Sequence, residues 1–152
     1  MDKFLNKDVI FRNLEFENSA QVISFLADKL LEAGYVKEGY KEAILERELE
    51  YPTGLPSNAP GIAIPHANHE LVNTTTLGIA TLKNPVSFQN MEDTKSAVEI
   101  QIVIMLAIDE PHGHIEMLQK IVGIIQDEAT RKNILAAESD NQLFSLLEKS
   151  LI

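Results

Sequence analysis

The run Gly-Ile-Ala-Ile-Pro-His at residues 61–66 constrains the fold and the chemistry of this chain more than any other feature. Its first four residues are small or apolar and predict a short buried strand. Pro65 ends that strand, because proline has no N–H for a sheet ladder. His66 therefore follows a stiff strand at the point where the sheet gives way to a loop. In open α/β sheets ligands gather at this edge, so His66 is the first candidate for a reactive group.

The length and composition indicate one ordinary globular domain. The chain has 152 residues, of which 45% are hydrophobic and 24% are charged, so we expect a single domain over residues 1–152 with a proper core. It contains no cysteine, which excludes disulfides and thiolate metal sites. The net charge of −10 argues against nonspecific binding of nucleic acid, because most of the surface would repel phosphate.

No segment of the sequence has the pattern of a secretion signal or a membrane span. Residues 1–8 mix charged and apolar side chains and lack the basic-then-apolar order of a signal peptide. The longest apolar-rich run, 97–108, contains Glu99 and Gln101 and is too short to cross a bilayer. We therefore expect a cytoplasmic protein with no direct membrane insertion.

Hydrophobic periodicity predicts both strands and helices along the chain. Apolar or alternating runs predict strands, which lie at 8–14, 61–64, 75–82, 86–88 and 98–108. Apolar residues at helical spacing predict helices, which lie at 19–33, 38–50, 114–126, 128–136 and 140–151. Asn18 or Ser19 is expected to cap the first helix, Gly34 to end it, and Asn84-Pro85 to form a turn. This order predicts an α/β fold, a three-layer α/β/α domain with a mixed central sheet flanked by helices.

The histidines lie in two clusters, each just after an expected strand. Two of them, His66 and His69, follow the strand expected at 61–64. The other two, His112 and His114, follow the strand expected at 98–108. If these strands are parallel neighbours, their carboxyl ends bring His66 close to one of the later pair. His114 also lies near the start of a helix, where free N–H groups and the helix dipole favour an anion. Two histidines, a helix N-terminus and a nearby cation would together make a good receptor for a phosphoryl group.

The candidate for a cation beside this receptor is Arg47, on the last turn of the helix at 38–50. Its guanidinium can bind phosphate oxygens through two parallel hydrogen bonds. Taken alone, however, the pattern favours a surface arginine paired with a neighbouring glutamate. Thr53 and Gly54, in the loop before His66, could supply a hydroxyl and a flexible approach for a partner, although a plain turn fits their spacing as well.

Other chemistries have weaker patterns. The spacings His66-x-x-His69 and His112-x-His114 leave a zinc-dependent hydrolase open, but no His-Glu-x-x-His run or cysteine ligand accompanies them. There is no glycine-rich phosphate loop for ATP and no Gly-x-Ser-x-Gly turn for a serine hydrolase. We expect no cofactor and no bound metal.

The stretch Arg-Glu-Leu-Glu-Tyr-Pro-Thr-Gly-Leu at 47–55, followed by Gly-Ile-Ala-Ile-Pro-His-Ala at 61–67, closely resembles a known family. This family comprises the enzyme IIA components of the bacterial phosphoenolpyruvate-dependent sugar phosphotransferase system (PTS), of the fructose/mannitol type. The resemblance extends over nearly the whole chain. Residues 46–54 and 84–89 look most like the galactitol-specific IIA proteins. The second histidine of the fructose/mannitol pattern matches His114, which keeps the wider fructose-type interpretation open.

The resemblance implies a phosphotransferase with a phosphohistidine intermediate. By resemblance, Nε2 of His66 accepts a phosphoryl group from the histidine-containing phosphocarrier protein and donates it to a cysteine of a IIB component. The IIB component then phosphorylates galactitol or a related sugar or polyol that enters through a membrane IIC permease. The same Pro-His element occurs in regulatory, nitrogen-type IIA phosphoproteins, so a regulatory function stays open.

The resemblance also implies roles for the residues around the acceptor. Arg47 is expected to stabilise the phosphate, and His114 is expected to support the acceptor. Binding of the partner is expected to involve three further residues, Thr53, Gly54 and Pro65.

Overall fold

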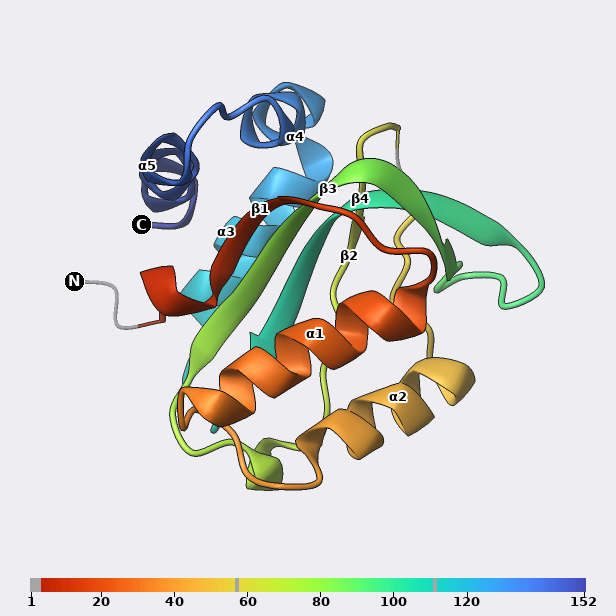
Figure 1. The fold of residues 1–152 in the computed structure, drawn as a ribbon, viewed down its shortest axis with the longest axis vertical. Helices are drawn as coiled ribbons and strands as arrows, with labels where there is room; N and C mark the ends of the chain where they lie inside the picture. The colour runs from red at the N-terminus through yellow and green to blue at the C-terminus, as the bar shows by residue number, and fades with distance from the viewer. Residues whose placement is uncertain (1–3, 57, 111) are drawn as a thin grey trace.

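Four strands form one mixed sheet with helices on both faces in the computed structural model, which describes residues 4–56, 58–110 and 112–152 (Figure 1). The strands are β1 (Ile10–Leu14), β2 (Gly61–Ala63), β3 (Thr76–Gln89) and β4 (Ala97–Ala107). The α-helices are α1 (Ser19–Glu32), α2 (Tyr40–Glu50), α3 (Ile115–Gln126), α4 (Glu128–Leu135) and α5 (Asp140–Leu151). Two short 3-10 helices are η1 (Lys7–Val9) and η2 (His69–Leu71).

The strand order is β1-β3-β4-β2. The central strands β3 and β4 are antiparallel, whereas β1 runs parallel to β3 and β2 runs parallel to β4. The mixed sheet expected from the sequence is therefore confirmed. The two strands that precede the histidine clusters, β2 and β4, are parallel neighbours.

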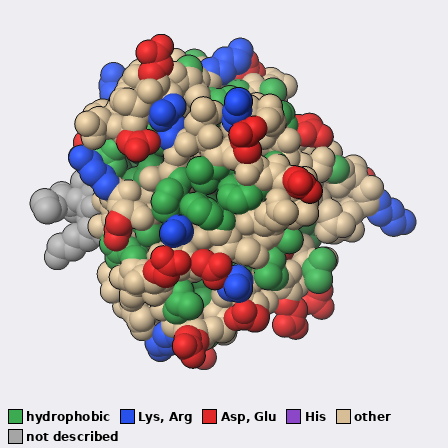
Figure 2. Space-filling model, viewed as in Figure 1, with side chains coloured by type: hydrophobic (Ala, Val, Ile, Leu, Met, Phe, Trp, Pro, Cys, Tyr) green, Lys and Arg blue, Asp and Glu red, His purple; other side chains and the backbone are tan. Residues whose placement is uncertain are grey.

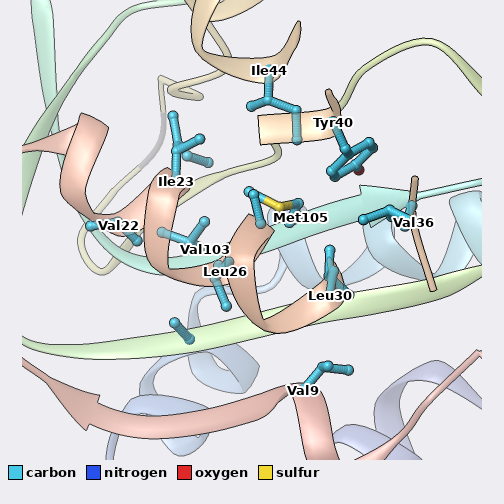
Figure 3. Close-up of a cluster of buried hydrophobic side chains, with 14 of the residues drawn as sticks. Val9, Val22, Ile23, Leu26, Leu30, Val36, Tyr40, Ile44, Val103 and Met105 are labelled. Carbon is cyan, nitrogen blue, oxygen red and sulfur yellow. The ribbon is translucent and has the colours of Figure 1, made fainter. Parts of the chain in front are cut away.

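The alternation of side chains along β4 explains the three layers, because successive residues of a strand point to opposite faces. One face of β4 belongs to the core cluster that includes α1 and α2, and it presents Val103, Met105 and Ala107. The other face belongs to the cluster that includes α3, α4 and α5, and it presents Ile102, Ile104 and Leu106. Figure 3 shows the first cluster, in which Leu26 of α1 and Ile44 of α2 lie over the sheet. Both faces of β4 are covered, as its continuous apolar run indicated.

The helix ends largely follow the sequence signals. The side chain of Asn18 accepts a hydrogen bond from the N–H of Gln21 at 2.9 Å and caps α1, and Gly34 follows the helix at φ +83°. Helix α2 begins at Tyr40, two residues later than expected.

Figure 2 shows acidic and basic side chains spread over the α1/α2 side, around a central apolar strip. None of the helices in the described part of the chain is long and apolar enough to cross a membrane.

One expectation about the strands is wrong. The sequence predicts a turn at Asn84-Pro85 that returns as a separate strand, but β3 continues through both residues against the same partner, β4. The pairing register shifts between Thr81 and Val86, so a bulge takes up the extra residues. Pro85 lies in this bulge, where the ladder is already interrupted and its missing N–H leaves no ladder bond unmade.

A buried guanidinium, which the sequence did not reveal, holds the chain that leads into β2. Arg131 of α4 is only 2% exposed and donates hydrogen bonds to the carbonyl oxygens of Pro60 and Asn58, each at 2.9 Å. It also donates to the carbonyl of Ile124 at 3.3 Å and to that of Ile125. Arg131 thus joins the carboxyl end of α3 to the segment before β2.

Candidate functional site

His66 lies directly beyond the carboxyl end of β2. Its backbone forms a parallel bridge with Leu106 of β4, and the N–H of Leu106 donates to the carbonyl of Pro65 at 2.9 Å. The buried hydroxyl of Tyr40 donates to the carbonyl of Leu106 at 3.1 Å. Pro65 therefore ends β2 without releasing the chain, and His66 stays beside the last residues of β4.

The imidazole of His66 is half-buried and is oriented by a backbone carbonyl just beyond the end of β2. Its Nδ1 lies 2.9 Å from the carbonyl oxygen of Ile64. A carbonyl oxygen can only accept, so Nδ1 carries the proton of the neutral ring and Nε2 keeps its lone pair. Burial lowers the pKa of His66, the carbonyl of Ile64 raises it and the charge of Arg47 lowers it, with a net shift downward. The ring is thus neutral near pH 7, with the lone pair on Nε2.

Beside His66 lies an open pocket of about 470 Å³. Its lining combines one cation, polar groups and apolar side chains, and includes Arg47, His66, Ala67, Asn68, His69, Leu106, Ile108 and Leu118. Within residues 4–56, 58–110 and 112–152, no ion pair holds the guanidinium of Arg47, which lies 5.3 Å from the ring centroid of Tyr51. The structure therefore brings together the predicted His66 and Arg47, with the cation available to an anion.

His114 does not line the pocket of His66. It is the N-cap residue of α3, and its Nε2 lies 3.1 Å from Oγ1 of Thr75 and 3.3 Å from Oδ1 of Asp109. The hydroxyl of Thr75 donates to Asp109 at 2.6 Å, and this bond, followed by the contact with His114, lowers the pKa of Asp109. The side chain of His114 lines a separate cavity, which Phe4 also lines. Parallel strands bring the two segments to one edge, but the imidazole of His114 faces an ionised carboxylate there.

The other two histidines are exposed. His69 begins η2 and contributes to the pocket of His66, whereas His112 lies in the loop between β4 and α3. In the part of the chain that the structure describes, no group of three or more histidine, cysteine, aspartate or glutamate side chains could hold a metal ion. The zinc alternative therefore has no ligand set among those residues.

Thr53 and Gly54 are buried, so the hydroxyl and the flexible approach expected from the sequence are not free for a partner. The hydroxyl and the N–H of Thr53 donate to Oε1 and Oε2 of Glu48, each at 2.9 Å. A Cβ on Gly54 would lie 2.6 Å from the carbonyl oxygen of Gln89 and 2.6 Å from Cγ2 of Val98. Both residues instead hold the loop against α2 and the sheet.

The close approach at Gly54 leads to a stability prediction. We expect Gly54→Ala to lower the free energy of unfolding by about 1–3 kcal/mol, because backbone and side-chain neighbours must move to admit the methyl group. Gly123→Ala in α3, where a Cβ meets no atom within 4 Å, should raise it by about 1 kcal/mol, since alanine is the better helix former. Chemical denaturation measures both changes. Equal stabilities of Gly54→Ala and the unsubstituted protein would contradict the packing described.

Sequence reasoning missed Glu48 and part of the pocket wall. Three glutamates lie near Arg47, and nothing in their spacing distinguishes Glu48 from Glu46 or Glu50. The rotation of α2 leaves the other two exposed and turns Glu48 toward Thr53, which only the folded chain reveals. The sequence does contain a signal for the apolar wall at Leu118, because the helical spacing of apolar residues places Leu118 on the apolar face of α3, near the start of that helix.

Comparison with known proteins identifies the family. Residues 3–150 match the family described as "Phosphoenolpyruvate-dependent sugar phosphotransferase system, EIIA 2". Over 151 residues the chain is 29% identical to the PTS system fructose-specific EIIABC component of Bacillus subtilis (strain 168), with 97% of this chain and 23% of that protein covered. Over 113 residues it is 26% identical to the PTS system galactitol-specific EIIA component of Escherichia coli (strain K12), with 74% of this chain and 75% of that protein covered.

A solved structure agrees in fold. The complex of enzyme IIA mannitol and phosphorylated enzyme IIB mannitol from Escherichia coli matches with a TM-score of 0.77 and 24% identity, over 95% of this chain and 96% of that chain. The chain spans less than a quarter of the fructose-specific relative, which is 23% covered. Because the family match takes in residues 3–150, the chain belongs to the EIIA 2 family of the phosphoenolpyruvate-dependent sugar phosphotransferase system.

Proposed function

We propose that the protein is a phosphoryl carrier and that Nε2 of His66 is the acceptor atom. The observation that carries this proposal is the 2.9 Å hydrogen bond between Nδ1 and the carbonyl of Ile64, which leaves the lone pair on Nε2. Family membership suggests the donor, the histidine-containing phosphocarrier protein, and the acceptor, a cysteine of a IIB component. The mannitol IIA relative solved in complex with phosphorylated IIB supports this choice of acceptor. A membrane IIC permease would then be an indirect partner.

The chemistry is two successive displacements at phosphorus. In the first, the Nε2 lone pair of His66 forms a bond to phosphorus while the N–P bond of the donor phosphohistidine breaks, and the donor imidazole takes the electron pair. In the second, the thiolate of the IIB cysteine forms the S–P bond while the Nε2–P bond breaks. If Nδ1 keeps its proton, the phosphorylated ring carries a positive charge, which makes Nε2 a good leaving group. His66 then returns to its neutral state.

The surrounding residues compensate the charge that the phosphoryl group brings, about −1.5 to −2 if it resembles other phosphorylated side chains. Arg47 is assigned phosphate stabilisation, because it lines the pocket and its guanidinium can form two parallel hydrogen bonds to phosphate oxygens. His114 is assigned the supporting role, which requires its imidazole to leave Asp109. Pro65, Thr53 and Gly54 are buried, so any part they play in partner binding is through the backbone shape that they impose.

Phosphorylation by purified components tests the proposal directly. The protein is incubated with phosphoenolpyruvate, enzyme I and the histidine-containing phosphocarrier protein, and the expected product carries one acid-labile phosphate. Addition of a cognate IIB component should remove that phosphate. A folded protein that takes up no phosphate overturns the assignment.

Replacement of Arg47 should change both the rate and the pKa of the acceptor. We expect Arg47→Met to slow phosphorylation on the order of tenfold, because phosphate loses a two-bond partner. The pKa of His66 should rise, since a positive charge that disfavours the imidazolium is removed. In the unsubstituted protein the rate should fall only as the pH drops through the lowered pKa, because an imidazolium has no lone pair on Nε2.

NMR titration of the His66 ring and rates of phosphate uptake measure the two effects of Arg47→Met. Arg47→Lys is the matched control. It keeps the charge and should preserve the pKa, while it loses the paired hydrogen bonds and should slow transfer by an intermediate factor. An unchanged pKa and rate in Arg47→Met would leave Arg47 with no part in the site.

The proposed sugar is galactitol or a related sugar or polyol. Two observations support this sugar. Residues 46–54 and 84–89 resemble the galactitol-specific IIA proteins, and the chain covers 75% of the galactitol-specific relative. Deletion of the gene should abolish growth on galactitol, and complementation should restore it. Loss of growth on fructose instead would assign the fructose system, which the 29% identical relative represents. Unchanged uptake of every sugar tested would favour a regulatory phosphoprotein.

A further inference from the structure

We propose that Glu48 is a positioning residue for phosphoryl transfer, which fixes His66 and Arg47 relative to each other without touching the phosphoryl group. The inference rests on the proposed function of His66. It goes beyond that function because it assigns a task to a carboxylate outside the reacting atoms.

The first connection leads from Glu48 to the imidazole. Its two carboxylate oxygens accept the hydroxyl and the N–H of Thr53, each at 2.9 Å. The carbonyl of Thr53 accepts the N–H of Ile64 at 3.3 Å. The carbonyl of Ile64 in turn lies 2.9 Å from Nδ1 of His66. Three consecutive links therefore join the carboxylate to the imidazole, and the last of them is the bond that fixes the tautomer of the acceptor.

The second connection leads from Glu48 to the cation. Glu48 follows Arg47 directly in the last turns of α2, so a carboxylate that holds Thr53 also holds the part of the helix that carries the guanidinium. The segment beyond Thr53 pairs with β2, because the N–H of Leu55 donates to the carbonyl of Ile62 at 3.0 Å. One side chain thus ties the helix of Arg47 to the strand that leads to His66.

The environment of Glu48 fits a residue with a specific task. Burial raises its pKa, and the two hydrogen bonds from Thr53 and the charge of Arg47 offset this only in part, so the net shift of the pKa is upward. A half-buried carboxylate is costly unless its oxygens are hydrogen-bonded, and both oxygens of Glu48 are. The glutamates on either side, Glu46 and Glu50, are exposed.

The test compares variants of Glu48 by rate and by the ring signals of His66. We expect Glu48→Ala to slow phosphorylation at saturating donor about tenfold, while the KM for the phosphocarrier protein stays unchanged, because misplaced reacting groups cost rate and not docking. The ¹⁵N shifts of the ring should move toward a mixture of tautomers, since Ile64 no longer has a fixed carbonyl. Glu48→Gln should restore most of the rate: the amide oxygen accepts the N–H of Thr53, and the Thr53 hydroxyl can accept from the amide nitrogen.

Two controls separate positioning from general loss of stability. Glu50→Ala removes an exposed carboxylate from the same helix end and should leave rate and ring signals unchanged. Ile134→Val, in the buried core on the α4 side, should lower the stability of the fold and leave the rate and the ring signals of His66 unchanged.

The outcomes distinguish this inference from the proposed function. If the unsubstituted protein takes up no phosphate, the phosphocarrier function fails. If that protein is phosphorylated and folded Glu48→Ala keeps its rate and its ring signals, only the role of Glu48 is overturned. Should Glu48→Ala prove unfolded, Thr53→Val against Thr53→Ser gives the same comparison, with the hydroxyl removed or kept.

Discussion

His66→Ala is expected to take up no acid-labile phosphate from the histidine-containing phosphocarrier protein, at any time at which the unsubstituted protein is fully labelled. The variant lacks the imidazole whose tautomer is fixed by the carbonyl of Ile64, with Nδ1 2.9 Å from that oxygen. Nε2 of His114 already faces Asp109 and Thr75, so it does not offer a free nucleophile in its place. Removal of the acceptor therefore removes the reaction rather than slowing it.

The controls for this experiment are the exposed histidines. His112→Ala lies outside the pocket of His66 and should be labelled at the unsubstituted rate, and His69→Ala should still accept one phosphate. Circular dichroism should show His66→Ala folded, because the ring is only half-buried and lies at the end of a strand. Label that persists in His66→Ala at the normal rate would move the acceptor to another residue.

The sequence predicted the parts of this site that depend on local chemistry. A buried apolar run that ends in proline produced β2, and a long apolar run produced β4, so the position of His66 at their shared edge followed from residues close to it. The sequence did not predict that β2 pairs with β4. The structure shows that the two strands are parallel neighbours.

The features that the sequence did not predict depend on residues far apart in the chain. The direction of His114 is set by Thr75, which lies 39 residues earlier and bonds to Nε2. The local turn signal at Asn84-Pro85 was overridden because β4 offers a partner on both sides of a bulge. Local sequence patterns predict neither a side-chain hydrogen bond between distant residues nor the pairing partner of a strand. For the same reason they did not reveal the four carbonyls that surround Arg131.

Arg131→Met is expected to lower the free energy of unfolding by about 3 kcal/mol or more, the largest stability change predicted here. The side chain of similar length fills the space but donates nothing, so the carbonyls of Asn58, Pro60 and Ile125 lose this donor, whereas the carbonyl of Ile124 keeps the N–H of Asp127 at 3.2 Å. Buried acceptors without partners cost about 1–3 kcal/mol each, and partial access of water reduces the sum. The positive charge also lies at the carboxyl end of α3, where the helix dipole favours it.

The consequence of Arg131→Met should extend to the reaction, because Pro60 directly precedes β2 and β2 presents His66. Chemical denaturation measures the stability, and phosphate uptake at rising temperature should fail earlier in the variant than in the unsubstituted protein. Lys132→Met is the matched control: this neighbour is exposed, pairs with the surface carboxylate of Glu128 at 2.8 Å, and should change stability by less than about 1 kcal/mol. If both variants lose the same small amount, the buried guanidinium does not hold the strand that carries the acceptor.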